Sequence, residues 1–475
     1  MPINGFLYPG ASGPPAAYEV DNSLRFDDGS SNQLYRVTSA GSDYKATFSA
    51  WVKRTTPGVE NFLLYAYYNS NNKHVLNFYQ DQIYINLIVD ASTAATVVTN
   101  RVFRDISAWM HVVVAWDTTQ STASDRIKVY VNGVQETSFG TANYPNQNTN
   151  IQFNRNTNGT YVGGQAGSNN FDGYMSEVVY IDGSALDPTS FGEFDSDTPN
   201  VWKPIDVSGL TFGTNGFYLE FKQSGTSQNS SGLGADTSGN DNHLAAQNLT
   251  SVAQSTDTCT NNFAILNSLY KQDHAFSDGN LTHTSSASDW DSGVSTIAAS
   301  SGKYYFEAKV TAIEPPTRTM LGVGDVRDAN EIAEDQFGLT NYDNGDTVAY
   351  YGSDGSVYKN GSQQSGSWSS FTTNDIVGMY VDLDNGKVYF HKNGTMQNSG
   401  DPTSGSTGTG AISITTGQTY VFGVTHYGGG AGQINFGSPP FSISSGNSDP
   451  NGYGNFEYST QNYYALNTKN LAEFG

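Results

Sequence analysis

Apolar and polar residues alternate along much of the chain, which is the pattern of half-buried β-strands. Residues 110–116 instead form a nearly continuous apolar run, typical of a strand at the centre of a sheet. No segment that could form a helix of more than a couple of turns begins with a convincing helix start signal. Asn-Gly pairs at 132–133, 385–386 and 393–394 follow strand-like segments and predict tight hairpin turns. The clearest alternating segments are 47–52, 83–89, 127–131, 303–310 and 377–383.

This pattern predicts an all-β chain of two β-sandwich domains of the jelly-roll type, joined by a polar linker. A length of 475 residues exceeds one ordinary sandwich and suits two domains. We expect an N-terminal arm at 1–19, a first sandwich at 20–205, a linker or connector at 206–270, a second sandwich at 271–446 and a C-terminal segment at 447–475. In the second sandwich, alternation in 303–310 predicts that its even-numbered residues face the core.

The same alternation predicts that Lys303, Glu307 and Lys309 face solvent. The linker is too long for a plain loop, so it either wraps one domain or forms a small ordered connector. Both chain ends are rich in aromatic residues, which would lose burial if left in water. The ends therefore either contact neighbouring proteins or fold back on their own domains.

Charge, cysteine content and the distribution of apolar residues limit which partners, disulfides and targeting segments the chain is expected to have. Lys and Arg number 22 against 45 Asp and Glu, which gives a net charge of −23 and disfavours nucleic acid as a partner. Cys259 is the single cysteine, so no intrachain disulfide forms and a buried structural thiol is expected. The N-terminus lacks the pattern of a signal peptide, and no apolar run has membrane-spanning length.

Ordered motifs in the first sandwich resemble a known family. The motifs are W-M-H-V-V-V-A-W at 109–116, I-K-V-Y-V-N-G at 127–133, Y-V-G-G at 161–164 and F-D-G-Y-M-S-E-V-V-Y-I at 171–181. Together they resemble the laminin-G-like, concanavalin-A-like jelly roll. Ser176 stands where that family often has Asp, which weakens the transfer of a calcium ligand to this position.

The second sandwich is similar to the SPRY domain, a bent β-sandwich that binds proteins through its loops. The similarity rests on G-K-Y-Y-F-E at 302–307, L-G-V-G at 321–324 and the stretch from 374 to 394, which contains D-I-V-G-M-Y-V-D and F-H-K-N-G. The resemblance implies a loop-mediated binding role for this domain.

The whole arrangement resembles structural proteins of marine bacteriophages, through the segments 236–242, 255–263 and 464–471. This resemblance implies a virion surface appendage (a tail fibre, spike or head fibre), made in the host cytoplasm without a signal peptide. We expect it to bind a host surface glycan or receptor through sandwich loops and to contact other virion proteins. We also expect a homo-oligomer, with a trimer favoured, and no membrane insertion.

Two alternatives stay open at this stage. One is a purely structural decoration or connector protein that binds other virion proteins. The other is a polysaccharide-degrading jelly-roll enzyme, which needs two carboxylates flanking the sugar. Glu193, Asp195 and Asp197 alternate suitably, but they lie between prolines in what reads as a loop. We therefore expect no enzymatic activity and assign no catalytic or cofactor-binding residues.

Calcium in the jelly roll is the one cofactor that the sequence suggests, because hard oxygen ligands are plentiful. Candidate ligands are Asp27, Asp28 and Gly29, Asp182 and Gly183, and Asp187, although each is equally a turn residue. The histidines show no metal-ligand spacing; they are His74, His111, His243, His274, His283, His391 and His426. Tyrosines cluster at 65, 67 and 68 and again at 350 and 351, and could contribute to a binding surface.

Overall fold

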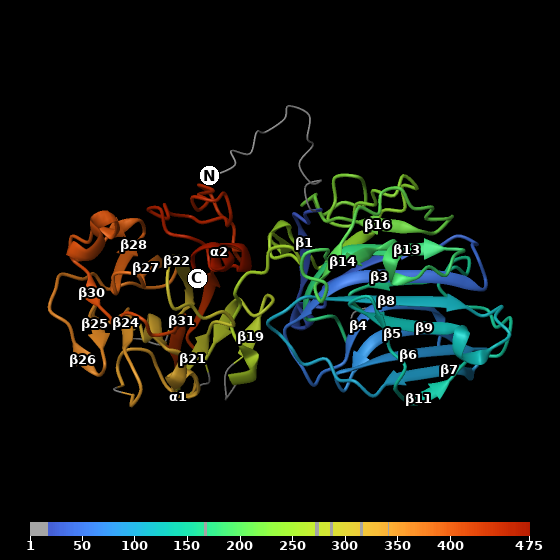
Figure 1. Cartoon of the computed structure of the whole chain (residues 1–475), viewed down its shortest axis with the longest axis horizontal. Coiled ribbons are helices and arrows are strands. Elements are labelled where there is room, and N and C mark those ends of the chain that lie inside the picture. The colour runs from blue at the N-terminus through green and yellow to red at the C-terminus, as the bar shows by residue number, and fades with distance from the viewer. Residues whose placement is uncertain (1–17, 166–168, 271–274, 286–287, 314–316, 341) are drawn as a thin grey trace, which may run out of the picture.

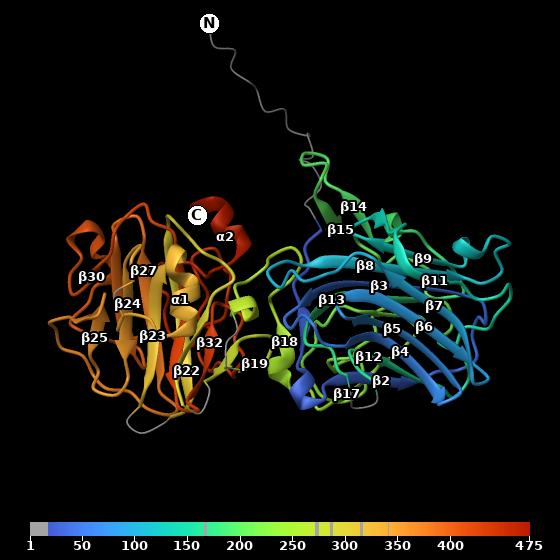
Figure 2. The same cartoon turned by 90° about the horizontal axis from the view of Figure 1, so that it is seen from below.

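The computed structural model describes residues 18–165, 169–270, 275–285, 288–313, 317–340 and 342–475. Strands account for 41% of the residues and helices for 8%, so the predicted all-β fold class is confirmed. Two sandwiches of antiparallel sheets lie side by side along the long axis of the molecule (Figures 1 and 2). The N-terminal arm (1–19) falls outside the described residues, apart from Tyr18 and Glu19.

The first sandwich consists of two eight-stranded sheets that we name sheet A and sheet B. Sheet A runs in the order β10 (Val134–Gln135), β9 (Ile127–Val131), β8 (Met110–Asp117), β3 (Lys45–Arg54), β13 (Gly173–Asp182), β1 (Ser23–Phe26) and β18 (Gln254–Ser255), with β16 (Phe217–Leu219) paired to β13. Sheet B runs in the order β11 (Phe139–Asn143), β7 (Ser92–Thr99), β6 (Gln82–Val89), β5 (Asn72–Tyr79), β4 (Asn61–Asn69), β12 (Gly159–Val162), β2 (Gln33–Val37) and β17 (Ala245–Gln247). A hairpin of β14 (Gly192–Phe194) and β15 (Trp202–Pro204) projects beside them.

The second sandwich consists of sheets C and D, with eight and six strands. Sheet C runs in the order β19 (Ala275–Ser277), β20 (Thr282–Thr284), β32 (Ala431–Asn435), β22 (Lys303–Ala312), β27 (Ile376–Asp382), β28 (Lys387–Lys392) and β29 (Thr395–Met396), with β30 (Ile412–Ser413) paired to β28. Sheet D runs in the order β21 (Trp290–Val294), β31 (Tyr420–Tyr427), β23 (Thr319–Asp325), β24 (Thr347–Tyr351), β25 (Val357–Lys359) and β26 (Ser362–Gln363). The described α-helices, α1 (Ala329–Glu334) and α2 (Thr468–Phe474), are short, and neither could cross a lipid bilayer.

The predicted Asn-Gly turns after β9 and β28 are present. Asn132 and Gly133 have φ angles of 48° and 76°, and Asn393 and Gly394 have 48° and 78°. Left-handed φ at both central residues is the geometry that matches the twist of a two-residue hairpin. These turns fix the register of β9 with β10 and of β28 with β29.

The expected linker at 206–270 is for the most part a piece of the first sandwich. Its strands β16, β17 and β18 pair with β13, β2 and β1. Several apolar residues of this stretch are buried in the first core, with Leu233 and Leu244 at 0% exposure, whereas Ala264, Ile265 and Leu266 are buried in the second core. The polar composition of the stretch hid the short strands β17 and β18.

The connector then enters a tight junction between the sandwiches. The side chain of Lys53 on β3 is fully buried, and its Nζ donates to Asp257 Oδ2 at 2.8 Å and to the Phe263 carbonyl at 2.9 Å. On the other side, Asn280 in the β19–β20 turn donates to the Thr55 carbonyl at 3.0 Å. The two domains thus share buried polar contacts at the junction.

The C-terminal segment at 447–475 folds back on the second sandwich. Tyr464 forms a parallel bridge with Tyr304, and Phe456 and Tyr463 are buried at 0% and 1% exposure. These rings pack on aromatic side chains of the outer face of sheet C, including Tyr305. Of the two alternatives for this end, folding back on its own domain is the one the structure shows.

This covering segment changes the environment of β22. Tyr304, Phe306, Ala308 and Val310 face the core as predicted. Glu307, expected in solvent, is fully buried because the backbone N–H groups of Glu457 and Tyr458 donate to its carboxylate at 2.8 and 3.4 Å. Burial raises the pKa of Glu307 to about 7.

Candidate functional site

A row of tyrosines crosses the outer face of sheet B. Tyr161 on β12 lies in register with Tyr35 on β2 and with Tyr65 on β4. The ring of Tyr161 is 4.7 Å from that of Tyr35 and 6.0 Å from that of Tyr65, measured between centroids. Because alternate residues of a strand face the same side, Tyr67 extends the row along β4.

We name these four residues, Tyr35, Tyr65, Tyr67 and Tyr161, the tyrosine face. Tyr67 stacks on Tyr65 at 5.9 Å and is 39% exposed, whereas Tyr65 is nearly buried by its neighbours. A Cβ atom at Gly159 would lie 2.9 Å from the ring of Tyr35 and 3.0 Å from that of Tyr161. Glycine at this position therefore lets the two rings come together over the strand.

Polar side chains border the tyrosine face at the start of β4. The carboxylate of Glu60 accepts hydrogen bonds from Asn77 Nδ2 at 2.7 Å and from Asn169 Nδ2 at 2.9 Å. Asn77 lies in register with Tyr84 on β6. Burial raises the pKa of Glu60, with the hydrogen bond from Asn77 opposing this shift. The border thus offers a carboxylate and two amides beside aromatic rings.

The predicted tyrosine clusters separate in the structure. Tyr65 and Tyr67 belong to the tyrosine face, whereas Tyr68 points elsewhere and lies under the guanidinium of Arg155 at 4.2 Å. Tyr350 is fully buried in the second core, and Tyr351 is half-buried against Trp290. Alternation along each strand explains why neighbours in sequence have different environments.

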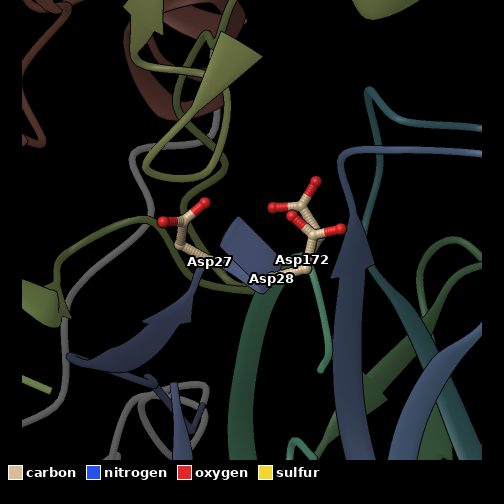
Figure 3. A group of neighbouring side chains, drawn as sticks. All are labelled: Asp27, Asp28 and Asp172. Carbon is tan, nitrogen blue, oxygen red and sulfur yellow. The ribbon is translucent and has the colours of Figure 1, made fainter. Parts of the chain in front are cut away.

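A second feature of the first sandwich is a group of three carboxylates, Asp27, Asp28 and Asp172 (Figure 3). Antiparallel pairing of β1 with β13 places Phe26 opposite Gly173, so the residues that follow β1 meet the residue that precedes β13. One oxygen from each carboxylate lies within 4.8 Å of the others. Since Ca²⁺ takes oxygen ligands, this acidic cluster could bind calcium.

The acidic cluster is largely removed from water. Asp27 is 6% exposed and Asp172 is 3% exposed, while Asp28 lies at the surface. Burial raises the pKa of Asp172 to about 7; a hydrogen bond from Thr56 opposes this shift, and the charges of Asp28 and Asp27 add to it. Of the residues suggested by sequence, Asp27 and Asp28 are brought together, and Asp172 is the member of the cluster that was missed.

Asp182 and Asp187 do not join the acidic cluster. Asp182 accepts hydrogen bonds from the backbone N–H groups of Ser42 at 2.8 Å and Asn215 at 3.0 Å. Asp187 caps the 3₁₀ helix at Pro188–Ser190 by accepting from the Thr189 N–H. Both carboxylates therefore stabilise turns, which was the alternative that the sequence left open.

The acidic stretch at 193–197 is not a plain loop, because Glu193 lies in the β14–β15 hairpin. Lys203 Nζ on β15 lies 3.3 Å from Glu193 Oε1 and 3.2 Å from Asp195 Oδ2. The Glu193 side chain is 58% exposed. These residues form an ion-paired surface hairpin rather than two carboxylates facing each other across a cleft.

Most described histidines are buried, and none belongs to a metal cluster among the residues that the structure describes. Burial lowers the pKa of His74, His111, His391 and His426 to about 3, so they are neutral at pH 7. His111 accepts a hydrogen bond from Trp202 Nε1 at 3.0 Å and contacts Ser49 Oγ at 2.8 Å. His274 lies outside the described residues.

Comparison with known proteins assigns both sandwiches. Residues 26–189 match the model of the concanavalin A-like lectin/glucanases superfamily, and residues 303–423 match the SPRY domain model. The chain combines a concanavalin A-like lectin/glucanase domain with a SPRY domain. The comparison with curated proteins gave no match.

Solved structures with similar folds cover one domain at a time. The SPRY domain of human HERC1 is 19% identical, with 34% of this chain and 92% of that chain covered and a TM-score of 0.27. A heptameric SAP-like pentraxin from Limulus polyphemus is 16% identical over 36% of this chain and 80% of that chain, with a TM-score of 0.27. Domain 4 of the arabinanase AbnA from Geobacillus stearothermophilus, in complex with arabinotriose, is 18% identical over 31% and 65% of the respective chains, with a TM-score of 0.24.

Several residues of the lectin-like domain were beyond the reach of sequence reasoning. Tyr35 and Tyr161 are far apart in sequence from Tyr65, and only the strand order β4–β12–β2 makes them neighbours. A signal was nevertheless present, because Tyr161 and Asp172 each lie within a motif that marks this fold. The motifs located the strands, whereas the pairing of the strands was needed to locate the sites.

Proposed function

We propose that the protein is a non-enzymatic, glycan-binding appendage of a virus particle, and that its tyrosine face receives the sugar. The observation that carries the proposal is the row of Tyr35, Tyr161 and Tyr65 across three adjacent strands, continued by the exposed Tyr67. The apolar face of a sugar ring can cover an aromatic ring, which removes apolar area from water. A concanavalin A-like lectin/glucanase fold is consistent with carbohydrate binding.

The polar border supports the same ligand class. Ligand sites combine an apolar floor with a few convergent polar groups that fix orientation. Glu60, Asn77 and Asn169 supply a carboxylate and amides beside the rings, and these groups suit sugar hydroxyls as acceptors and donors. In this proposal the sugar is bound without a metal ion, since the described acidic cluster lies in the loops of β1 and β13 rather than on the tyrosine face.

Binding by the full-length protein to a panel of bacterial polysaccharides tests the proposal, with Tyr67→Ala as the variant and Tyr68→Ala as the matched control. The two neighbours are 39% and 44% exposed, but only Tyr67 belongs to the tyrosine face. We expect Tyr67→Ala to weaken binding about tenfold, which corresponds to about 1.4 kcal/mol of lost ring contact, and Tyr68→Ala to leave it unchanged. Equal effects of the two substitutions, or binding that survives Tyr67→Ala and Tyr161→Ala, would overturn the site.

The virion setting is proposed from the resemblance of the segments 236–242, 255–263 and 464–471 to phage structural proteins. Labelled antibody should decorate the outside of purified particles, and the protein should form a homo-oligomer, with a trimer favoured. Decoration of particles without any glycan binding would favour the purely structural decoration or connector protein. Release of shortened sugars from a bound polysaccharide, lost in Glu193→Gln, would show the enzyme instead.

A further inference from the structure

A buried amine, a carboxylate and a carboxamide meet at the junction between the two domains. Lys53 Nζ lies 2.8 Å from Asp257 Oδ2 and 2.7 Å from Asn262 Oδ1. The side chains of Lys53 and Asp257 are 0% and 1% exposed. One hydrogen-bonded group therefore contains a nucleophilic nitrogen, a carboxylate that can accept its proton, and a carbonyl carbon that the nitrogen can attack.

The carboxamide of Asn262 is held with its oxygen toward the amine. Its Nδ2 atom donates to the Ser107 carbonyl at 2.6 Å, and its Oδ1 atom accepts from Lys53. The backbone of Asn262 is also fixed, because its N–H donates to Thr468 Oγ1 at 3.0 Å and its carbonyl accepts from the Thr468 N–H at 2.9 Å. The amine nitrogen is thus kept beside Cγ, the carbon that carries Oδ1, and a reaction between groups held in this way avoids the entropy cost of bringing them together.

The carboxylate of Asp257 is oriented toward the amine by hydrogen bonds to its other oxygen. Asp257 Oδ1 accepts from Trp109 Nε1 at 3.0 Å and from the Phe263 N–H at 3.3 Å, while Oδ2 accepts from Lys53. The ring of Tyr174 lies 5.6 Å from Lys53 Nζ. Burial lowers the pKa of Lys53, and the charge of Asp257 opposes this shift. A site without exposed surface therefore makes transfer of the proton from the amine to the carboxylate less costly than it is in water.

 
We propose that Lys53 and Asn262 become joined by an isopeptide bond, with Asp257 as the catalytic acid and base. The ion pair is the starting state, in which the Lys53 ammonium transfers one proton to Asp257 Oδ2. The lone pair of Nζ then attacks Cγ of Asn262, and the π electrons of the carbonyl move to Oδ1. The carbonyl re-forms as the Cγ–Nδ2 bond breaks. Asp257 gives its proton to Nδ2, which leaves as ammonia, and accepts the second proton from Nζ. One C–N bond replaces another, so the reaction needs no oxidant or reductant.

The bond ties strand β3 of the first sandwich to the segment that enters the second sandwich. Ala264 and Ile265, which follow Asn262, are buried in the second core. The chain has one cysteine, so an intrachain disulfide cannot make such a link. An isopeptide bond at this place keeps the two domains covalently joined at their contact, whereas the ion pair joins them only while both are folded.

The mass of the full-length protein, folded first and denatured for the measurement, tests the proposal. We expect the chain to be lighter than its sequence by one molecule of ammonia, and its tryptic digest to contain a branched peptide that joins residue 53 to residue 262. The branched peptide distinguishes this bond from any other loss of ammonia. Lys53→Met should have its full sequence mass. Lys45→Met is the matched control on the same strand, because the Lys45 side chain is 40% exposed and pairs with Asp117, and it should keep the bond.

The Asp257→Asn variant tests the role of the carboxylate while Lys53 and Asn262 stay in place. Because the variant lacks the group that carries the protons, we expect it to form the bond at least about a hundredfold more slowly than the parent protein, with its fold checked by circular dichroism. Bond formation at the parent rate in this variant would overturn the role of Asp257. The parent protein decides the proposal independently of any variant: a folded parent chain that keeps its full sequence mass on prolonged incubation contains an ion pair only, and this result would overturn the isopeptide bond.

Discussion

Replacing Asp257 with Ala should destabilise the domain junction by about 3–5 kcal/mol, because the change leaves a buried ammonium without its counter-charge. The Lys53 and Asp257 side chains are 0% and 1% exposed. Lys53 Nζ would keep two neutral acceptors, Asn262 Oδ1 at 2.7 Å and the Phe263 carbonyl at 2.9 Å. Trp109 Nε1, which donates to Asp257 Oδ1 at 3.0 Å, would also lose its acceptor. Burial already lowers the pKa of Lys53, with the charge of Asp257 opposing the shift.

The free energy of unfolding can be measured by guanidinium titration followed by tryptophan fluorescence. The matched control is Asp125→Ala, which removes a pair with Lys128 whose side chains are 44% and 35% exposed. This exposed pair should contribute less than about 1 kcal/mol. The double variant Lys53→Met with Asp257→Leu should lose less than the sum of its single variants, since no charge is left unpaired. A cost below about 1 kcal/mol for Asp257→Ala, or an additive double variant, would refute the reasoning.

Two further predictions concern pH and the C-terminal segment. Burial raises the pKa of Glu177 and Glu307 from 4.5 to about 7, so both bind protons more tightly in the folded state, and their contribution to the free energy of unfolding should fall as pH rises through this window. The four buried histidines, whose pKa values are lowered to about 3, contribute the opposite slope below pH 6.5, so the carboxyl contribution is measured as the difference between the parent protein and the double variant Glu177→Gln with Glu307→Gln. The slope of this difference should reach about 1.4 kcal/mol per pH unit for each group, and a difference that stays flat in denaturant titrations from pH 4.5 to 8 would contradict it. Deleting 447–475 should lower the melting temperature of the SPRY domain in calorimetry, because Tyr305 and Tyr380 lose their cover; an unchanged melting temperature would show that the segment is a free contact arm.

Strand positions were predictable because the alternation of apolar and polar residues within a strand reflects which of its side chains are buried. The alternation in 303–310 identified the four inward residues of β22, and the Asn-Gly pairs located two hairpin turns. These features depend on residues close together in sequence. The burial of Glu307 depends instead on a segment about 150 residues later in the sequence, whose backbone N–H groups donate hydrogen bonds to its carboxylate.

The strands β17 and β18 of the connector could not be located from the sequence for a related physical reason. Residues 206–270 are polar because β16–β18 are short strands at the margins of the two sheets, where few side chains need burial. Their pairing partners lie up to 232 positions earlier, as with Ser23 and Ser255. The acidic cluster shows the same limit, since Asp28 lies beside Asp172 only through the register of β1 with β13.

The junction decides how the two domains act together. A rotation of one domain relative to the other would break the three hydrogen bonds of Lys53, whose side chain has no exposed surface. It would also break the hydrogen bond that the Tyr174 hydroxyl donates to the Gly279 carbonyl at 2.9 Å. Since the unpaired ammonium is costly to bury, we expect the tyrosine face and the SPRY loops to keep a fixed relative orientation. If the protein is the virion appendage proposed above, multivalent binding would then arise from repetition of the chain on the particle, with spacing set by the assembly rather than by a flexible linker.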